Sequence, residues 1–192
     1  MEQRIRVRES VALGAGVILI GDSTTNISNT TPVLLTSHCL GYLSKINMNA
    51  IKSVRTVKKA GSSHISDIFT NIESLTVSCD YMELTPKNTL IALGGDGTTG
   101  VTAKMSGEIS LTPNDAWHRL EIYFTYPNKI NRKVYIIPKV KVVSPFDDEF
   151  FKVDAGIENS MEFQASSAIE STPRSANWKN NPLGKVIFQS LQ

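Results

Sequence analysis

Apolar and polar residues alternate along several stretches of this chain, and such alternation predicts β-strands with one dry and one wet face. The clearest stretch, residues 72–84, alternates Leu75, Val77, Cys79 and Tyr81 with Ser74, Thr76, Ser78 and Asp80. Pro138 lies inside another strand pattern and predicts a sheet edge or a bulge there, because proline cannot donate a ladder hydrogen bond. Further strands are expected at residues 108–111, 120–126, 133–143, 157–165 and 186–188.

Two long segments are poor in the residues that break strands. Residues 42–58 and 62–82 contain neither proline nor glycine. The sequence Gly61-Ser62-Ser63 at their junction is typical of a chain reversal. We therefore expect these segments to form one long β-hairpin.

One short helix stands out against this background. Thr85 is a plausible N-cap, and Pro86 occupies the favoured first helical position. Gly94 follows an apolar run at the place where a left-handed C-cap glycine belongs. Residues 86–93 are therefore predicted to form a helix about 12 Å long, which must pack on the sheet to be stable. Thr112-Pro113 predicts a second short helix or turn.

The N-terminal segment combines charge with an apolar run. Arg4, Arg6 and Arg8 alternate with apolar residues and precede the apolar run of residues 11–20. A secretory signal is one interpretation. Two glycines in the run and acidic residues before it favour an extended arm that enters a buried strand. We expect an arm and first strand over residues 1–20, with no membrane-spanning segment.

Composition supports one globular domain. The 192 residues are 41% hydrophobic and 20% charged, and the net charge is +2. This balance excludes wholesale disorder and a dedicated nucleic-acid binder. We expect a single mainly-β domain over residues 1–192, a β-sandwich or partial barrel with a long hairpin and one short flanking α-helix. Residues 166–192 form a C-terminal tail or arm.

Few groups of residues in the sequence are typical of a catalytic, cofactor-binding or metal-binding site. The string Gly94-Gly95-Asp96-Gly97-Thr98 resembles the glycine-rich signature of NAD kinases and diacylglycerol kinases, although a helix C-cap and turn explains it better. The acidic run of residues 147–149 is typical of a solvated turn. Cys39 and Cys79 are expected to be two buried thiols, with a single disulfide bridge between them as the alternative. The three histidines show no metal-ligand spacing. We therefore expect no catalytic, cofactor-binding or metal-binding residues.

Three aromatic side chains stand beside irregular sequence. Phe150, Phe151 and Trp178 would anchor a neighbouring molecule if they were exposed, and packing in the core is the alternative. Together with Arg4, Arg6 and Arg8, they are our candidates for assembly contacts.

The order of these elements resembles the tail tube protein, the major tail protein of long-tailed bacteriophages. The resemblance depends on residues 72–88, in which a strand leads into Thr85-Pro86-Lys87-Asn88, and on the apolar helix and glycines that follow. Residues 136–140 and 160–165 add to it, the latter resembling the penultimate strand of such proteins.

The resemblance implies a structural protein of the virion, made in the cytoplasm of the bacterial host. Copies would form hexameric rings that stack into a tube, with other tail proteins as partners. The hairpin of residues 42–82 would join a barrel around a lumen through which DNA passes without specific binding. The expected contacts between rings are the N-terminal arm and residues 144–152 and 174–185.

A conduit for DNA should not retain it. Because DNA carries one negative charge per roughly 1.7 Å, a basic lumen would slow its passage. A neutral or acidic lumen is therefore expected. Two alternatives remain open: a small nucleotide-binding enzyme that uses the string of residues 94–98, and a monomeric β-sandwich binding module.

Overall fold

The computed structural model describes nine stretches of the chain, and every structural statement below concerns these residues alone. They contain nine β-strands, two short α-helices and two 3-10 turns, η1 (Thr36–His38) and η2 (Ala176–Trp178). The described stretches are residues 16–41, 43–58, 65–81, 85–96, 101–103, 106–107, 115–126, 131–145 and 159–190.

Seven of these strands form one antiparallel sheet with the order β1-β6-β7-β8-β3-β2, and β9 lies beside β7. The mainly-β expectation is therefore confirmed. The strands are β1 (Val17–Asp22), β2 (Leu43–Lys58), β3 (Ile65–Tyr81), β6 (His118–Thr125), β7 (Asn131–Val142), β8 (Asn159–Ala165) and β9 (Lys185–Ser190). Two further strands, β4 (Val101–Ala103) and β5 (Ser106–Gly107), pair separately.

Strand β7 divides the large sheet into two halves. Its first part pairs with β9, and residues 140–142 pair with β8 on the same edge. Pro138 lies between these parts, where Arg119 of β6 is the one residue opposite two residues of β7. The expected bulge is thus confirmed. We call β1, β6, β9 and the start of β7 the β9 half, and β2, β3, β8 and the end of β7 the hairpin half.

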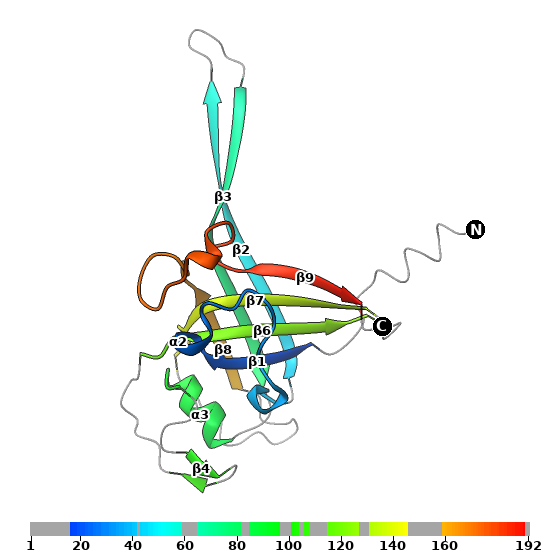
Figure 1. The fold of residues 1–192 in the computed structure, drawn as a ribbon, viewed down its shortest axis with the longest axis vertical. Helices are drawn as coiled ribbons and strands as arrows, with labels where there is room; N and C mark the ends of the chain where they lie inside the picture. Colours follow the sequence, from blue (N-terminus) through cyan, green and yellow to red (C-terminus); the bar gives the residue numbers. More distant parts are fainter. Residues whose placement is uncertain are drawn as a thin grey trace, which may run out of the picture.

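The main core lies between the two halves of the sheet. It joins Ile18 and Ile20 of β1 and Leu120 and Ile122 of β6 with side chains of β3, β8 and α3. Val77, Cys79 and Tyr81 of β3 point into this core, as their alternation predicted. The sheet therefore bends around its own apolar side, with strands of the two halves running in different directions (Figure 1).

A second, smaller cluster lies on the opposite side of the β9 half. Val134 and Ile136 of β7 pack there against Ile27, Ala168 and Trp178. Ile27 follows α2, between β1 and β2, and Ala168 and Trp178 lie between β8 and β9. Among the described residues, this side of the sheet is therefore covered by two connecting segments and not by a second sheet.

Helix α3 (Pro86–Ala92) closes one end of the core as the sequence predicted. The Thr85 side chain accepts a hydrogen bond from the Asn88 amide, which is the expected N-cap. Gly94 has a φ of 82° and donates its amide to the Ile91 carbonyl, while the Gly95 amide bonds the Leu90 carbonyl. This pair of bonds is the Schellman arrangement that ends a helix at glycine.

A second helix, α2 (Ser23–Asn26), was not expected. Asp22 caps it by accepting from the amides of Thr24 and Thr25. The buried Ser23 hydroxyl donates to the Pro138 carbonyl at 2.6 Å. Four residues with poor helix propensity cannot hold a helix alone, so these tertiary contacts stabilise it.

The predicted hairpin is confirmed: β2 and β3 pair along their whole length, from Leu43 opposite Tyr81 to Lys58 opposite Ile65. Strand β8 covers the other edge of β3 only along residues 76–81. The distal half of the hairpin therefore leaves the body as a two-stranded ribbon (Figure 1).

Most of the remaining predicted strands are confirmed, and the others fall on residues that the structure does not describe. Strands β6, β7, β8 and β9 confirm four of the expected strands. Both cysteines are free thiols, as expected. Cys79 is buried as predicted, whereas Cys39 is only half-buried, so its predicted burial was wrong. Residues 108–111, the Thr112-Pro113 pair and the acidic run at 147–149 lie outside the described residues.

Candidate functional site

The outer side of the hairpin half is polar throughout its width. Rows of directly opposed residues cross β2, β3 and β8, such as Lys45, Asp80 and Ser160. Two lysines and two carboxylates balance one another on this side. Its members are Lys45, Asn47, Asn49, Thr76, Ser78, Asp80, Lys141, Ser160, Glu162 and Gln164. This polar face is neutral, and it ends at two exposed apolar side chains, Ile51 and Val143, which lie two positions beyond Asn49 and Lys141.

The distal half of the hairpin exposes apolar side chains instead. Ile68 is paired with Thr56, and Ile72 is paired with Lys52. These residues lie on the same side of the hairpin that, nearer the body, faces the core. Val54 is 62% exposed, Ile68 56% and Ile72 45%. The apolar side of the sheet thus continues beyond the body that could cover it. Such a surface is typical of a contact with another molecule.

Two strand edges of the hairpin are also open. Within the described part of the chain, β2 pairs with β3 alone. Residues 65–75 of β3 likewise pair only with β2. An edge of this length presents unpaired backbone donors and acceptors, which favours pairing with another chain.

The outer side of the β9 half differs, because buried charges hold loops against it. The Arg119 Nε atom donates to the Glu121 Oε1 atom at 2.9 Å, and both side chains are fully buried. Arg119 also donates to the carbonyls of Asn26, Asn29 and Thr31. Burial lowers the pKa of Arg119, although the Glu121 carboxylate favours its charged form.

The Glu121 carboxylate completes this network. It accepts hydrogen bonds from the amides of Val33 and Leu34 and from the Tyr123 hydroxyl. Burial and this hydrogen bond to Glu121 raise the pKa of Tyr123. The pair thus replaces lost hydration with six hydrogen bonds besides its own ion pair, and it fixes the segment of residues 26–34.

The second covering segment, residues 166–184, is held in the same way. The buried Lys139 ammonium donates to the Ser171 carbonyl and lies 4.4 Å from the centre of the Trp117 ring. Burial lowers the pKa of Lys139, and the nearby Lys141 lowers it further. The Trp178 indole donates to the Ile27 carbonyl at 2.6 Å, so the two covering segments also contact each other.

The structure describes one of the six candidate assembly residues. Trp178 was expected to anchor a neighbour, but its side chain is 1% exposed and belongs to the second cluster of this chain. If residues 174–185 contact a neighbouring copy, side chains other than Trp178 would therefore make that contact. Arg4, Arg6, Arg8, Phe150 and Phe151 lie outside the described residues, and their assembly role stays a prediction.

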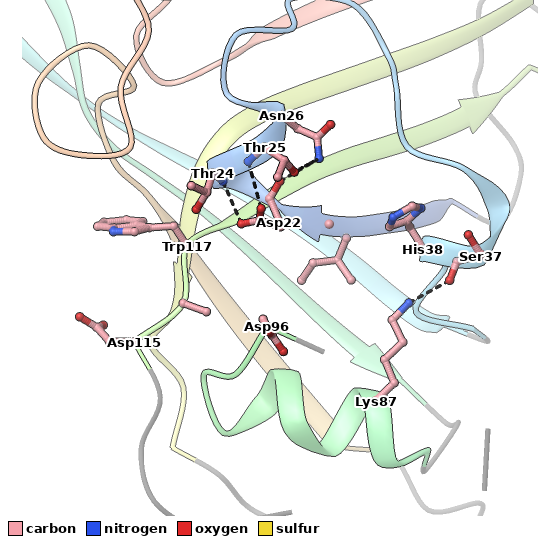
Figure 2. Close-up of a pocket in the computed structure, with 13 residues that line it drawn as sticks. Asp22, Thr24, Thr25, Asn26, Ser37, His38, Lys87, Asp96, Asp115 and Trp117 are labelled. Carbon is pink, nitrogen blue, oxygen red and sulfur yellow. Dashed lines mark hydrogen bonds between the residues drawn. The ribbon is translucent and has the colours of Figure 1, made fainter. Parts of the chain in front are cut away.

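A pocket of about 750 Å³ lies where β1, α2, η1 and α3 meet. Figure 2 shows Asp22 and Asp96 on its walls and Lys87 reaching across to the Ser37 carbonyl, at 3.1 Å. Burial lowers the pKa of Lys87. Trp117 and Asp115 lie at its rim and point away from the centre (Figure 2). The Asp22 carboxylate is already used to cap α2, so the pocket does not present a free pair of carboxylates for acid–base catalysis.

His118 lies beside this pocket, opposite Asp22 in the strand register. It is 1% exposed, and burial lowers its pKa to about 4 despite the carboxylates of Asp22 and Asp96 nearby. The Gly95 backbone forms a hydrogen bond with the ring. Its Nε2 atom has no hydrogen-bond partner among the described residues. The ring is therefore neutral at pH 7 and is not positioned as a general acid.

The glycine-rich string does not present its first two amides to a ligand. Gly94 and Gly95 both donate their amides to carbonyls of α3, as described above. A phosphate-binding loop needs such amides free to point at the anion. This use of the amides favours the interpretation as a helix end, and Gly97 and Thr98 lie outside the described residues.

The described residues offer little support for other kinds of site. The described residues contain no cluster of three or more histidine, cysteine or acidic side chains that could hold a metal ion. None of the described helices has the length and apolar character needed to cross a membrane. No family model matches the chain, and no curated protein is significantly similar to it. The open hairpin is therefore the best candidate for a functional surface.

Proposed function

We propose that the chain is a structural protein that assembles with copies of itself into stacked rings. Given the resemblance of its sequence to phage tail tube proteins, the assembly would be the tube of a phage tail. Six copies would form each ring, and DNA would pass through the lumen into the host. The protein would then reside in the virion, contact other tail proteins and catalyse no reaction.

The observation that carries this proposal is the hairpin β2–β3. Its distal half pairs with no further strand of the described chain and exposes Val54, Ile68 and Ile72 on one side. Both features are costly in a monomer, because open edges and apolar surface promote uncontrolled association. Closure into a ring would pair the edges and cover the apolar side.

The polar face supports the role of a conduit. If the hairpin half lines the lumen, this face meets the DNA. Its two lysines are balanced by Asp80 and Glu162, and Lys141 pairs with Asp115. A neutral wall forms few lasting contacts with phosphates, so DNA would slide past it.

Electron microscopy of the purified full-length chain tests the proposal. We expect rings or tubes with a central channel, and light scattering should give a mass several times 21.1 kDa. Ile68→Gln should strongly weaken assembly, since it places a polar, uncharged side chain on the side of the ribbon that copies would bury. Asn71→Gln is the matched control on the same strand. Asn71 pairs with Ser53 on the other side of the ribbon, so this variant should assemble normally.

Two outcomes would contradict the proposal. Monodisperse monomers of the unaltered chain at all concentrations would favour the monomeric binding module. Equal assembly of the Ile68→Gln and Asn71→Gln variants would show that the apolar side of the hairpin forms no contact between copies.

A further inference from the structure

We propose that successive copies join edge to edge through their hairpins, with the basic strand β2 of one copy against the acidic strand β3 of the next. This inference rests on the proposed function, because it names the contact and the charges that would set the order of copies in a ring. Four observations support it.

The two strands of the hairpin carry opposite charges. Strand β2 contains four basic residues and no acidic one, whereas β3 contains three acidic residues and no basic one. The basic residues are Lys45, Lys52, Arg55 and Lys58, and the acidic residues are Asp67, Glu73 and Asp80. The hairpin therefore has a positive strand and a negative strand.

Both strands have an edge that another copy can reach. Among the described residues, the outer edge of β2 has no partner strand, and neither does the outer edge of β3 over residues 65–75. The distal ribbon thus presents a basic edge and an acidic edge at the same height above the body. Two different edges on one molecule are what a head-to-tail contact requires.

The charges on these edges are available for such a contact. Lys52, Arg55, Asp67 and Glu73 are all exposed. The ion pairs that the described chain forms involve other residues, namely Arg119 with Glu121 and Lys141 with Asp115. Among the side chains that the structure describes, the distal charges of the hairpin are therefore not neutralised by ion pairs with one another.

Strand direction and register agree with the pairing. Copies arranged around an axis with their hairpins parallel place β2 beside the next β3, and these two strands run antiparallel. Within one hairpin, Lys52 is opposite Ile72, so the next copy at the same height brings Glu73 close to Lys52. Arg55 and Asp67 share a side of the ribbon by alternation and would approach each other diagonally. A contact between two β2 edges would place like charges together, so the charges select head-to-tail order.

Charge reversal on each edge tests this pairing in the full-length chain. One variant carries Lys52→Glu and Arg55→Glu, so both of its edges are acidic. The other carries Asp67→Lys and Glu73→Lys, so both of its edges are basic. Thr125→Glu and Thr125→Lys are charge controls at an exposed position of β6, away from the hairpin. Circular dichroism should show that all variants fold, because every altered side chain is exposed.

Each edge variant alone should need at least about tenfold more protein to assemble than the unaltered chain. An equimolar mixture of the two edge variants should assemble again, because every acidic edge then finds a basic one. The two controls should assemble like the unaltered chain.

Other results would overturn the inference. If the edge variants assemble as readily as the controls, the edge charges are irrelevant, and the proposed function stands on its own evidence. If each variant fails and the mixture also fails, the two edges do not meet. If the unaltered chain never assembles, both this inference and the proposed function are wrong.

Discussion

The outer sides of the two halves of the sheet differ: one is covered by the rest of the chain, and the other is not. In the β9 half, the outer side carries an apolar cluster and buried charged side chains, and two irregular segments cover both. In the hairpin half, the outer side of the body is bare and polar, and the distal ribbon exposes apolar side chains. Both halves belong to one hydrogen-bonded sheet, so the difference arises from what the rest of the chain supplies.

The two halves also differ in whether their polar groups are bonded within the chain. Arg119, Glu121 and Lys139 are buried, and each binds backbone or hydroxyl groups of the same chain. On the distal hairpin, by contrast, the outer strand edges pair with no further strand of the described residues. Its apolar side chains are exposed. Stability of the single molecule therefore depends on the β9 half, and association would depend on the hairpin half. Three predictions test this separation.

The largest effect on folding should come from the buried ion pair. Arg119→Ala leaves the Glu121 carboxylate buried without its cation and frees three carbonyls, so the free energy of unfolding should fall by about 3–5 kcal/mol. Lys141→Ala is the matched control, because the Lys141–Asp115 pair is partly exposed; it should cost about 1 kcal/mol or less. Urea denaturation measures both, and equal losses would contradict the assigned role of burial.

A somewhat smaller effect should follow acidification. The pKa of His118 is about 4 in the folded chain and 6.5 when unfolded, so below pH 6.5 the unfolded state binds the proton first. The free energy of unfolding should therefore fall as the pH drops from 6.5 to 4, by about 3 kcal/mol in total. About 2 kcal/mol of this should be lost by pH 5, before most carboxylates titrate.

His118→Gln serves as the control for this pH dependence. It removes the titrating ring, so its unfolding free energy should change much less between pH 6.5 and pH 5. Parallel urea curves at several pH values make the comparison. An unchanged slope in the variant would assign the pH dependence to other groups.

The smallest effect on folding should come from the distal hairpin. Val54→Ser removes an apolar side chain that is 62% exposed, so the free energy of unfolding of the monomer should change by less than about 0.5 kcal/mol. Phe163→Ala, at a fully buried position of β8, should cost about 3–5 kcal/mol. If Val54→Ser destabilises the monomer as much, the hairpin is packed within its own chain, and the contrast between the halves fails.

Much of the fold could be predicted because its signals are local. Alternation in residues 72–84 identified the second part of β3, and apolar or β-branched runs identified β6–β9. The scarcity of breakers in residues 42–58 and 62–82 identified the hairpin. Thr85 and Gly94 marked the two ends of α3, since caps depend on hydrogen bonds to residues only a few positions away.

The roles of single side chains could not be predicted in this way. Trp178 lies in a polar segment, and its burial depends on Ile27, which is 151 residues away in the sequence. Arg119 and Glu121 resemble the solvated face of a strand until residues 26–34 fold over them. The signal in the sequence was weak: two opposite charges at spacing i, i+2 inside an apolar strand.

The sequence by itself determined the mainly-β class, the long hairpin, the short capped helix and the segregation of charge between the hairpin strands. These properties follow from side-chain alternation, backbone preferences and composition, which act over a few residues. Only the tertiary structure decided which side of the sheet is covered, which charges are buried and which edges stay open. Those outcomes depend on contacts between segments far apart in the chain, because burial of a polar group is tolerated only where distant backbone groups replace its water.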